Sequence, residues 1–310
     1  MSIHKIEPNE DTLHGFFSRD LSPILTIDSG DTVHFRTLEA EWGLENFTAT
    51  TFDPKVGPPA HRTATTKVEG PRGHALCGPV AIRGAQPGMT LAIKIEKIRI
   101  GTWGWTVGEF ANDHIMHLWE LDPDQLHGRN QHGHKVNLRP FMGVMGMPLS
   151  EDGKLSTQPP RFTGGNLDCK ELVASSTLYL PIAVQGGLFS TGDGHAVQGD
   201  GEVSRTAIEC PMEDVELSFQ LLPDLHLDMP RAETPAGWLT FGFDESLNAA
   251  AQTALGDMIN LMAEKYNIPH VDAKALASLV VDMRITQIAN GVFGVHAVLP
   301  HNAIEMQNRS

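Results

Sequence analysis

The order of apolar and polar positions predicts β-strands along most of the chain. In three segments, residues 27–37, 85–100 and 210–221, a turn containing Gly, Pro or Asp is followed by apolar residues at every second position. Because successive side chains of a strand point to opposite faces, this alternation is typical of antiparallel strands with one buried face. Residues 101–160 are rich in Gly, Pro, His and Trp without a clear period, so we expect long loops with short elements there.

Helical periodicity appears only near the C-terminus. Over residues 247–262, apolar residues recur every three or four positions, and Asp244 or Ser246 is suited to the N-cap of that helix. A second helix is expected from Asp272 to Met283. The apolar segment that follows predicts a closing pair of strands.

These patterns predict a mainly β protein in which a helical pair is inserted near the C-terminus. We expect two sandwich-like β units within a single unit that spans residues 1–310. Its parts are a β-rich region over 1–240, a helical region over 244–284 and a closing β segment over 285–304.

The charge of the chain narrows the classes of partner. A formal net charge of −15 argues against nucleic acid and against an anionic membrane, since both require a basic surface. It suits a small neutral or cationic ligand, or a cation held by carboxylates. Three widely spaced cysteines, no signal peptide and no long apolar run together predict a cytoplasmic protein.

A glycine-rich stretch over residues 161–202 carries the main candidate chemistry. Asp193 and His195 are two positions apart, so an extended backbone places both side chains on one face. Glu202 follows across a Gly-Asp-Gly turn, and Asp168 follows a Gly-Gly turn. Carboxylates with an imidazole form the ligand set of zinc-like ions. The same residues also fit plain hairpin turns with His195 on the surface.

Other groups offer competing or additional sites. Backbone N–H groups near residues 164–166 form either an anion-binding nest or a plain turn. Five histidines over residues 114–134 provide a rival metal site, with two of them three residues apart on a helix. Cys169, Lys170 and Glu171 contain the residue types of a thiol-dependent amidase, but adjacent residues of a strand cannot converge on one atom. We therefore expect Cys169 to be a buried structural thiol.

Several stretches of the chain resemble the acetamidase/formamidase family. They are GHALCGP (73–79), GAQPGMTLAIKI (84–95), GTWGW (101–105), PFMGVMGMP (140–148), FTGGNLDCKEL (162–172) and LFSTGDGHAVQGDGEV (188–203). The resemblance implies a β-rich enzyme of two sandwich-like units that hydrolyses short aliphatic amides to a carboxylate and ammonia with a bound divalent metal ion. The motif residues it carries over are His74, Asn166, Asp168, Asp193, His195 and Glu202.

The resemblance, together with the residue chemistry, gives specific roles to these side chains. Asp168, Asp193 and His195 are the expected ligands of a divalent ion, zinc or else calcium, and Glu202 is the expected general base. Backbone groups from Gly164 to Asn166, with Gly165 and Asn166 as catalytic residues, are expected to hold the oxyanion. His74 is a possible additional site residue.

The expected substrate is a small amide, and the expected assembly is a homodimer. Two other functions fit the same sequence. One is a metal hydrolase of this scaffold that acts on another small C–N substrate. The other is a non-catalytic β-sandwich whose Asp-rich turns bind calcium.

Overall fold

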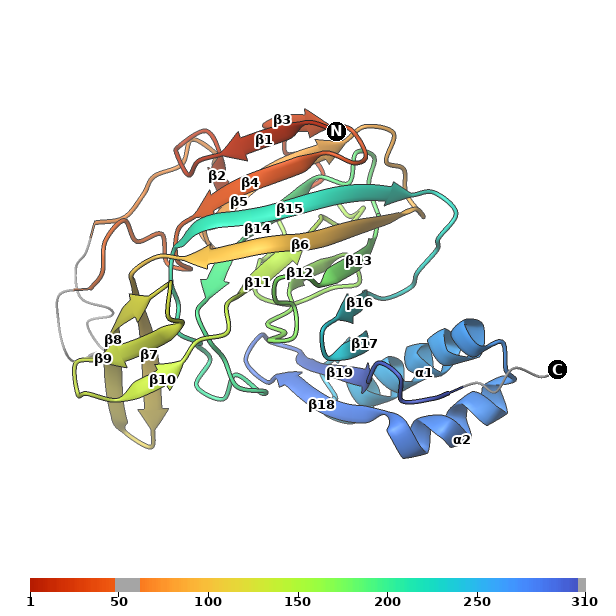
Figure 1. The fold of residues 1–310 in the computed structure, drawn as a ribbon. Coiled ribbons are helices and arrows are strands. Elements are labelled where there is room, and N and C mark those ends of the chain that lie inside the picture. Colours follow the sequence, from red (N-terminus) through yellow and green to blue (C-terminus); the bar gives the residue numbers. More distant parts are fainter. Residues whose placement is uncertain (48–61, 306–310) are drawn as a thin grey trace.

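The structure is a computed structural model that describes residues 1–47 and 62–305, and it is mainly β (Figure 1). Its largest element is a nine-stranded sheet that runs across the whole molecule. In spatial order its strands are β1 (Ile3–Ile6), β4 (Thr32–Thr37), β15 (Met212–Leu222), β6 (Thr90–Ile100), β13 (Thr177–Pro181), β16 (Arg231–Thr234), β17 (Gly237–Asp244), β19 (Phe293–Leu299) and β18 (Asp282–Gln287).

A second sheet packs against one end of the first and completes a β-sandwich (Figure 1). Its strands are β12 (Gly164–Asn166), β11 (Phe141–Gly146), β14 (Phe189–His195), β5 (Leu76–Ile82) and β2 (Leu13–His14), with β3 (Leu25–Ile27) also paired to β5. Phe189 of β14 contacts Phe35 and Phe219 of the large sheet, with ring centroids 6.3 and 5.1 Å apart. This packed aromatic core fixes β14, the strand that carries the candidate chemistry, against a rigid layer.

The three segments with alternating apolar residues are confirmed as strands. They form β4, β6 and β15, and β15 pairs in antiparallel fashion with both of the others. Val33, Ile93 and Leu217 from these strands are fully buried, as the alternation requires of one face. The predictions of a mainly β fold and of a C-terminal helical pair are likewise confirmed.

The prediction of loops over residues 101–160 is wrong for most of that range. It holds a four-stranded antiparallel sheet of β7 (Trp103–Phe110), β8 (Asp113–Asp122), β9 (His127–Asn130) and β10 (Lys135–Asn137), followed by β11. This sheet lies at one end of the sandwich (Figure 1). Its strands contain many Gly and His residues and are partly buried on both faces, so they lack the clear two-residue period that marks an amphipathic strand.

Two helices cover the other end of the large sheet. Helix α1 (Leu247–Tyr266) begins after Ser246, whose side chain accepts from the N–H of Ala249 at 3.5 Å, and it packs on β17 and β19. Helix α2 spans His270–Val280, so it begins and ends earlier than predicted, and Met283 lies in β18. In the described residues, neither helix is long and apolar enough to cross a membrane.

Candidate active site

The candidate site is built around the end of strand β14, which carries Asp193 and His195. All seven residues of this strand are buried. Its neighbour β11 leaves room for the acids because it has glycine at position 143. A Cβ atom at Gly143 would lie 2.5 Å from Oδ2 of Asp193 and 2.7 Å from Oδ1 of Asp168. A side chain at this position would therefore displace both carboxylates.

Three acids of the site have left-handed backbone conformations. The φ angles are 47° at Asp168, 58° at Asp193 and 44° at Glu202. Residues other than glycine seldom adopt this conformation, and when they do it is often at functional sites where the surrounding structure holds the strain. Each acid is thereby turned out of the regular path of its strand or loop. The three carboxylates therefore converge because of the backbone conformation at these positions as well as because of where the acids occur in the sequence.

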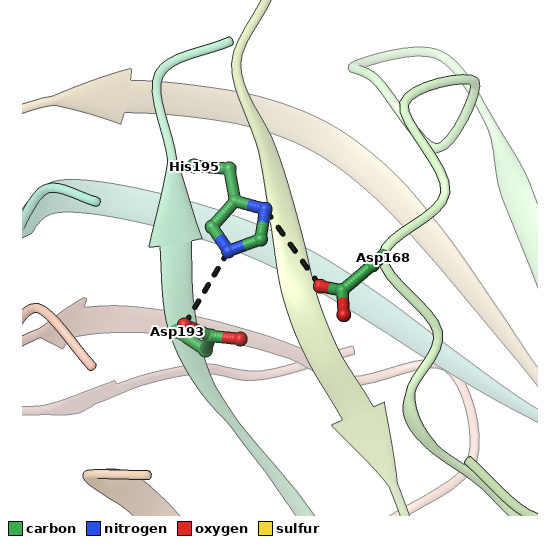
Figure 2. Close-up of side chains that lie close together, drawn as sticks. All are labelled: Asp168, Asp193 and His195. Atoms are coloured by element: carbon green, nitrogen blue, oxygen red, sulfur yellow. Dashed lines mark ion pairs between the residues drawn. The ribbon is translucent and has the colours of Figure 1, made fainter. Parts of the chain in front are cut away.

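His195 lies at the centre of the carboxylates. Its Nε2 atom is 3.4 Å from Oδ1 of Asp193 and 3.3 Å from Oε2 of Glu209, and its Nδ1 atom is 3.7 Å from Oδ1 of Asp168. Figure 2 shows the ring between the carboxylates of Asp168 and Asp193. Glu202 also belongs to the cluster, because it forms a close group with His195 and Glu209. The structure thus brings together all four of the acidic and imidazole side chains that we predicted for metal binding and base catalysis.

Gln198 fixes the orientation of the His195 ring. Its Oε1 atom lies 2.9 Å from Nδ1 of His195, and its Nε2 atom donates to the main-chain oxygen of Asp168 at 2.8 Å. Because the amide nitrogen is already committed to Asp168, Oε1 must accept the hydrogen bond from Nδ1–H of the imidazole. Nε2 therefore faces Asp193 and Glu209, to which it donates when the ring is charged, and it offers its lone pair to a cation when the ring is neutral. Metal-binding histidines have this arrangement, in which the second nitrogen donates to an outer partner.

Burial and mutual repulsion alter the proton affinities of the whole cluster. Burial, followed by the charge of Asp168, raises the pKa of Glu202 to about 10. Burial also raises the pKa of Glu209 to about 7 and that of Asp168 above its usual value. Burial opposes charge on Asp193 and His195 too. For Asp193 the positive charge of His195 prevails and lowers the pKa, and for His195 the charges of Glu209 and Asp193 raise the pKa.

The cluster fits a divalent cation. Asp168, Asp193, Glu202 and Glu209 are each at most 6% exposed, and none of them forms an ion pair with Lys or Arg in the described part of the chain. Four buried carboxylates with one imidazole are a large uncompensated charge. Two overlapping groups, Asp168–Asp193–His195 and His195–Glu202–Glu209, have ligand atoms within 4.8 Å of one another. A cation held by these atoms would replace the protons that the cluster otherwise binds.

The remaining predicted residues lie beside this cluster. His74 is half-buried just before β5, its Nδ1 atom has no hydrogen-bond partner, and its charge affects Asp168 and Asp193. Asn166 is buried in β12 with an unpaired Oδ1 atom. Gly165 pairs with Met145 of β11.

The segment 164–166 is a short strand rather than an open nest. The N–H of Gly164 already donates to the main-chain oxygen of Arg161 at 3.0 Å. The expectation that Gly164 holds the oxyanion is therefore wrong, because its donor is occupied. The N–H of Gly165 is likewise used in the pairing with Met145, whereas the side chain of Asn166 has an unpaired Oδ1 atom.

Three residues of the site were not predicted from the sequence, namely Gln198, Glu209 and Asn290. Glu209 is fully buried and bridges to the backbone of His195 and of Trp105. Asn290 reaches the site from the connection between β18 and β19, where its Nδ2 atom donates to Oδ2 of Asp168. Glu209 lies just before a predicted strand, and an acid beside an apolar run only weakly indicates a site residue. Asn290 lies in an ordinary turn sequence, which does not indicate a site residue.

The rival histidine site is not assembled as a metal centre. His114 and His117 lie on strand β8, so the helix proposed for them is wrong. The rings of His117, His132 and His134 contact one another, and Nδ2 of Asn130 donates to Nδ1 of His117 at 2.8 Å and of His134 at 3.1 Å. These nitrogens are thereby used as acceptors. In the described ranges, every close group of possible metal ligands includes His195.

The adjacent residues Cys169, Lys170 and Glu171 have separate environments, although they lie in a turn after β12 and not on a strand as we expected. Cys169 is fully buried, and burial raises the pKa of its thiol. Lys170 pairs with Asp200 at 2.9 Å, and Glu171 pairs with Arg139 and Arg284. The three side chains do not form a catalytic set.

Comparison with known proteins agrees with this fold. The model of the acetamidase/formamidase family matches residues 149–300, which contain every member of the buried cluster. The chain is related to the acetamidase/formamidase family. A crystal structure of an acetamidase from Bacillus halodurans is 27% identical to the chain and superposes with a TM-score of 0.83, over 96% of this chain and 97% of that one.

Two curated relatives of the chain align with it over part of their length. A formamidase from Methylophilus methylotrophus is 27% identical over 196 residues, which are 42% of this chain and 47% of that protein. A putative formamidase from Schizosaccharomyces pombe is 25% identical over 267 residues, which are 66% of this chain and 62% of that protein. The chain therefore spans about half to three fifths of the length of these relatives.

Proposed function

We propose that the protein hydrolyses primary amides of the formamide or acetamide type to a carboxylate and ammonia. The observation that carries this proposal is the buried group of four carboxylates around His195, which lies within the part of the chain that matches the acetamidase/formamidase family. Such a cluster is costly to bury unless it performs chemistry or holds a cation. The names of the relatives support amides as the substrate class.

The cation we propose is a divalent ion, with zinc favoured over calcium. Asp168, Asp193 and His195 would hold it, and Glu209 offers a further carboxylate on the Nε2 side of the ring. The central position of an imidazole favours zinc, because calcium prefers ligand sets made only of oxygen. When bound, such an ion supplies an acidified water and polarises a carbonyl oxygen. The same imidazole makes a non-catalytic calcium-binding module the weaker alternative.

Glu202 is the group we assign to proton transfer. Its Oε2 atom has no hydrogen-bond partner. Without a cation, burial and the charge of Asp168 raise its pKa to about 10. A positive charge beside Asp168 would offset the negative charge of that carboxylate. The pKa of Glu202 would then fall closer to neutrality, where a general base is most effective. Glu202 would then take a proton from the attacking water and return it to the departing nitrogen, which leaves as ammonia.

The developing oxyanion needs donors on the opposite side of the substrate. The side-chain amide of Asn166 is the candidate, since this residue lies in β12, two positions before Asp168, whereas the N–H of Gly165 is used in the pairing with Met145 of β11. His74 is a candidate for binding the substrate, because it is half-buried and its Nδ1 atom is unpaired. Two or three fixed donors of this kind typically contribute a large share of the rate acceleration in acyl transfer.

Ammonia release tests the proposal directly. The full chain, loaded with Zn²⁺, is incubated with formamide and acetamide, and both ammonia and the carboxylate are measured. We expect equal amounts of the two products, and we expect a chelator to abolish both, with recovery on return of Zn²⁺. Turnover of carbamates or nitriles without turnover of either amide would favour a different C–N substrate. Bound metal without turnover of any substrate would favour a binding module. A homodimeric state and a cytoplasmic location stay predictions.

A further inference from the structure

A pocket adjoins the cluster between two separate parts of the fold. The segment 197–208, which connects β14 to β15, forms a closed loop whose ends are joined by a hydrogen bond from the N–H of Ile208 to the oxygen of Val197 at 3.1 Å. This loop passes between the four-stranded sheet and the β18–β19 end of the large sheet (Figure 1). Together with β7, β8 and β10 it borders an open pocket of about 410 Å³.

The walls of this pocket are mainly apolar, and the pocket reaches the cluster. Trp119 from β8, Val136 from β10, and Val197 and Ile208 from the loop contribute to them. Glu202 lines it as well, and so does Gln198, which holds the ring of His195. A ligand in this space would therefore touch both apolar side chains and the group we assign to proton transfer.

A second, neighbouring pocket does not reach the carboxylate cluster. It has a volume of about 290 Å³, and Trp105, Val107 and Arg205 contribute to its walls. None of the carboxylates around His195 lines it. Of these two spaces, only the one beside Val136 is suited to hold part of a molecule that reacts at the cluster.

Two polar atoms of residues that line the larger pocket have no partner. Nε1 of Trp119 and Oε2 of Glu202 are buried without a hydrogen bond. An unpaired buried donor or acceptor costs about 1–3 kcal/mol, so such atoms often mark the place of a ligand or an ordered water. Both atoms are closed to solvent, so the pocket meets Trp119 and Glu202 through other atoms of these side chains.

We propose that this pocket is the acyl-group subsite and that the preferred substrates are primary amides with a branched aliphatic or aromatic acyl group. This inference rests on the amide-hydrolase function proposed above and extends its preferred substrates from formamide and acetamide to primary amides with larger acyl groups. Formamide and acetamide carry only a hydrogen atom or a methyl group on the carbonyl carbon. A volume of about 410 Å³ is far larger than such groups require, and pockets of this size usually enclose most of a larger ligand.

The physical consequence is a preference that grows with apolar size. Each buried methylene contributes about 0.8 kcal/mol, or roughly a fourfold change in affinity. If that gain is made in the transition state it appears in kcat/KM. We expect kcat/KM for isovaleramide or phenylacetamide to exceed the value for formamide by about tenfold to a few hundredfold.

Filling the pocket tests this assignment. Val136→Trp places a large ring in the subsite, and Val107→Trp is the matched control, since both valines are half-buried strand residues and Val107 lines only the smaller pocket. We expect Val136→Trp to lower kcat/KM for phenylacetamide by about tenfold or more, while formamide turnover stays within about twofold. Val107→Trp should leave the ratio of the two substrates unchanged.

Val136→Ala keeps the test valid if the tryptophan variant does not fold. It enlarges the subsite without introducing bulk, so it should raise the kcat/KM of phenylacetamide relative to isovaleramide. The proposal is overturned if the wild-type protein turns over formamide best and both Val136 variants affect all amides equally; the amide-hydrolase function would then still stand. Absence of turnover with every amide would overturn both.

Discussion

The side-chain amide of Asn290 donates to Oδ2 of Asp168 at 2.5 Å, across 122 positions of the chain. Asn290 is itself held by Gln287, whose Oε1 atom accepts from the backbone N–H of Asn290 at 3.0 Å and of Ala289 at 2.7 Å. In addition, Gly201 forms hydrogen bonds with the backbone of Thr286 and Ile288, both at 3.0 Å. The C-terminal segment therefore positions one proposed metal ligand and the loop that carries Glu202.

Asn290→Ala should weaken metal binding more than it weakens the fold. The substitution removes the donor that holds Oδ2 of Asp168, and the loss of an outer partner of this kind typically lowers metal affinity or activity by about 10–100-fold. Competition with a chelator of known affinity measures the Zn²⁺ affinity, and thermal unfolding in the presence of the chelator measures the fold. Asn260→Ala, on the exposed face of α1, is the matched control. Unchanged Zn²⁺ affinity in Asn290→Ala would show that this contact does not position the ligand.

Glu202→Gln should abolish most turnover while leaving the fold and most of the bound metal in place. The amide cannot take a proton from water, and general base catalysis contributes about 10²–10⁴-fold to rate. Circular dichroism and elemental analysis check fold and metal, and ammonia release checks turnover. Glu245→Gln, an exposed acid before α1, is the control for charge removal. A kcat close to that of the wild type would remove Glu202 from the mechanism.

Cys169→Ser should retain substantial amide hydrolysis. The thiol is fully buried and its pKa is raised, so little thiolate exists near neutral pH. Its neighbours Lys170 and Glu171 form ion pairs elsewhere and cannot activate it. Steady-state assays and mass spectrometry of the protein during turnover are the measurements. A loss of several orders of magnitude in kcat, together with a thiol-linked acyl adduct in the wild type, would replace the metal-based proposal with a thiol nucleophile.

The sequence predicted local features of the site better than its long-range contacts. Asp193 and His195 are two positions apart on a strand, so their proximity follows from local geometry, and Nε2 of His195 lies 3.4 Å from Oδ1 of Asp193 in the structure. The three alternating segments also became neighbouring strands. In contrast, Glu209 reaches His195 through a bridge between separate segments, and Asn290 reaches Asp168 through the order of strands in the large sheet. Such contacts depend on tertiary arrangement, which no local pattern encodes.

His195→Ala should lower both bound metal and activity, whereas the double variant His117→Ala/His134→Ala should leave both unchanged. His195 belongs to both candidate groups of ligands, and Gln198 orients its ring. In the other cluster, the Nδ1 atoms accept from Asn130. Elemental analysis of the two purified proteins gives the metal stoichiometry. Full metal content in His195→Ala, with loss in the double variant, would move the metal site to the four-stranded sheet.

Removal of the metal should make the stability of the protein depend strongly on pH. In the metal-free protein, burial raises the pKa of Glu209 from 4.5 to about 7. A carboxyl whose pKa is raised by folding contributes stability that is fully present below pH 4.5 and is lost as the pH rises toward 7. This loss is on the order of 3 kcal/mol for Glu209 alone. The raised pKa of His195 acts in the same direction at higher pH, because its protonated form is the one that the fold favours.

The metal-loaded protein should lack most of this dependence, because a cation replaces the protons in the cluster. We therefore expect the difference in Tm between loaded and chelated protein to widen as the pH rises from 5.5 to 8. Ligand deprotonation strengthens metal binding over the same range and adds to the effect. Thermal unfolding of both forms across this range is the measurement, with His195→Ala as the control that should show a much smaller gap. A gap that stays constant or narrows with rising pH would show that the buried carboxylates do not exchange protons for a cation.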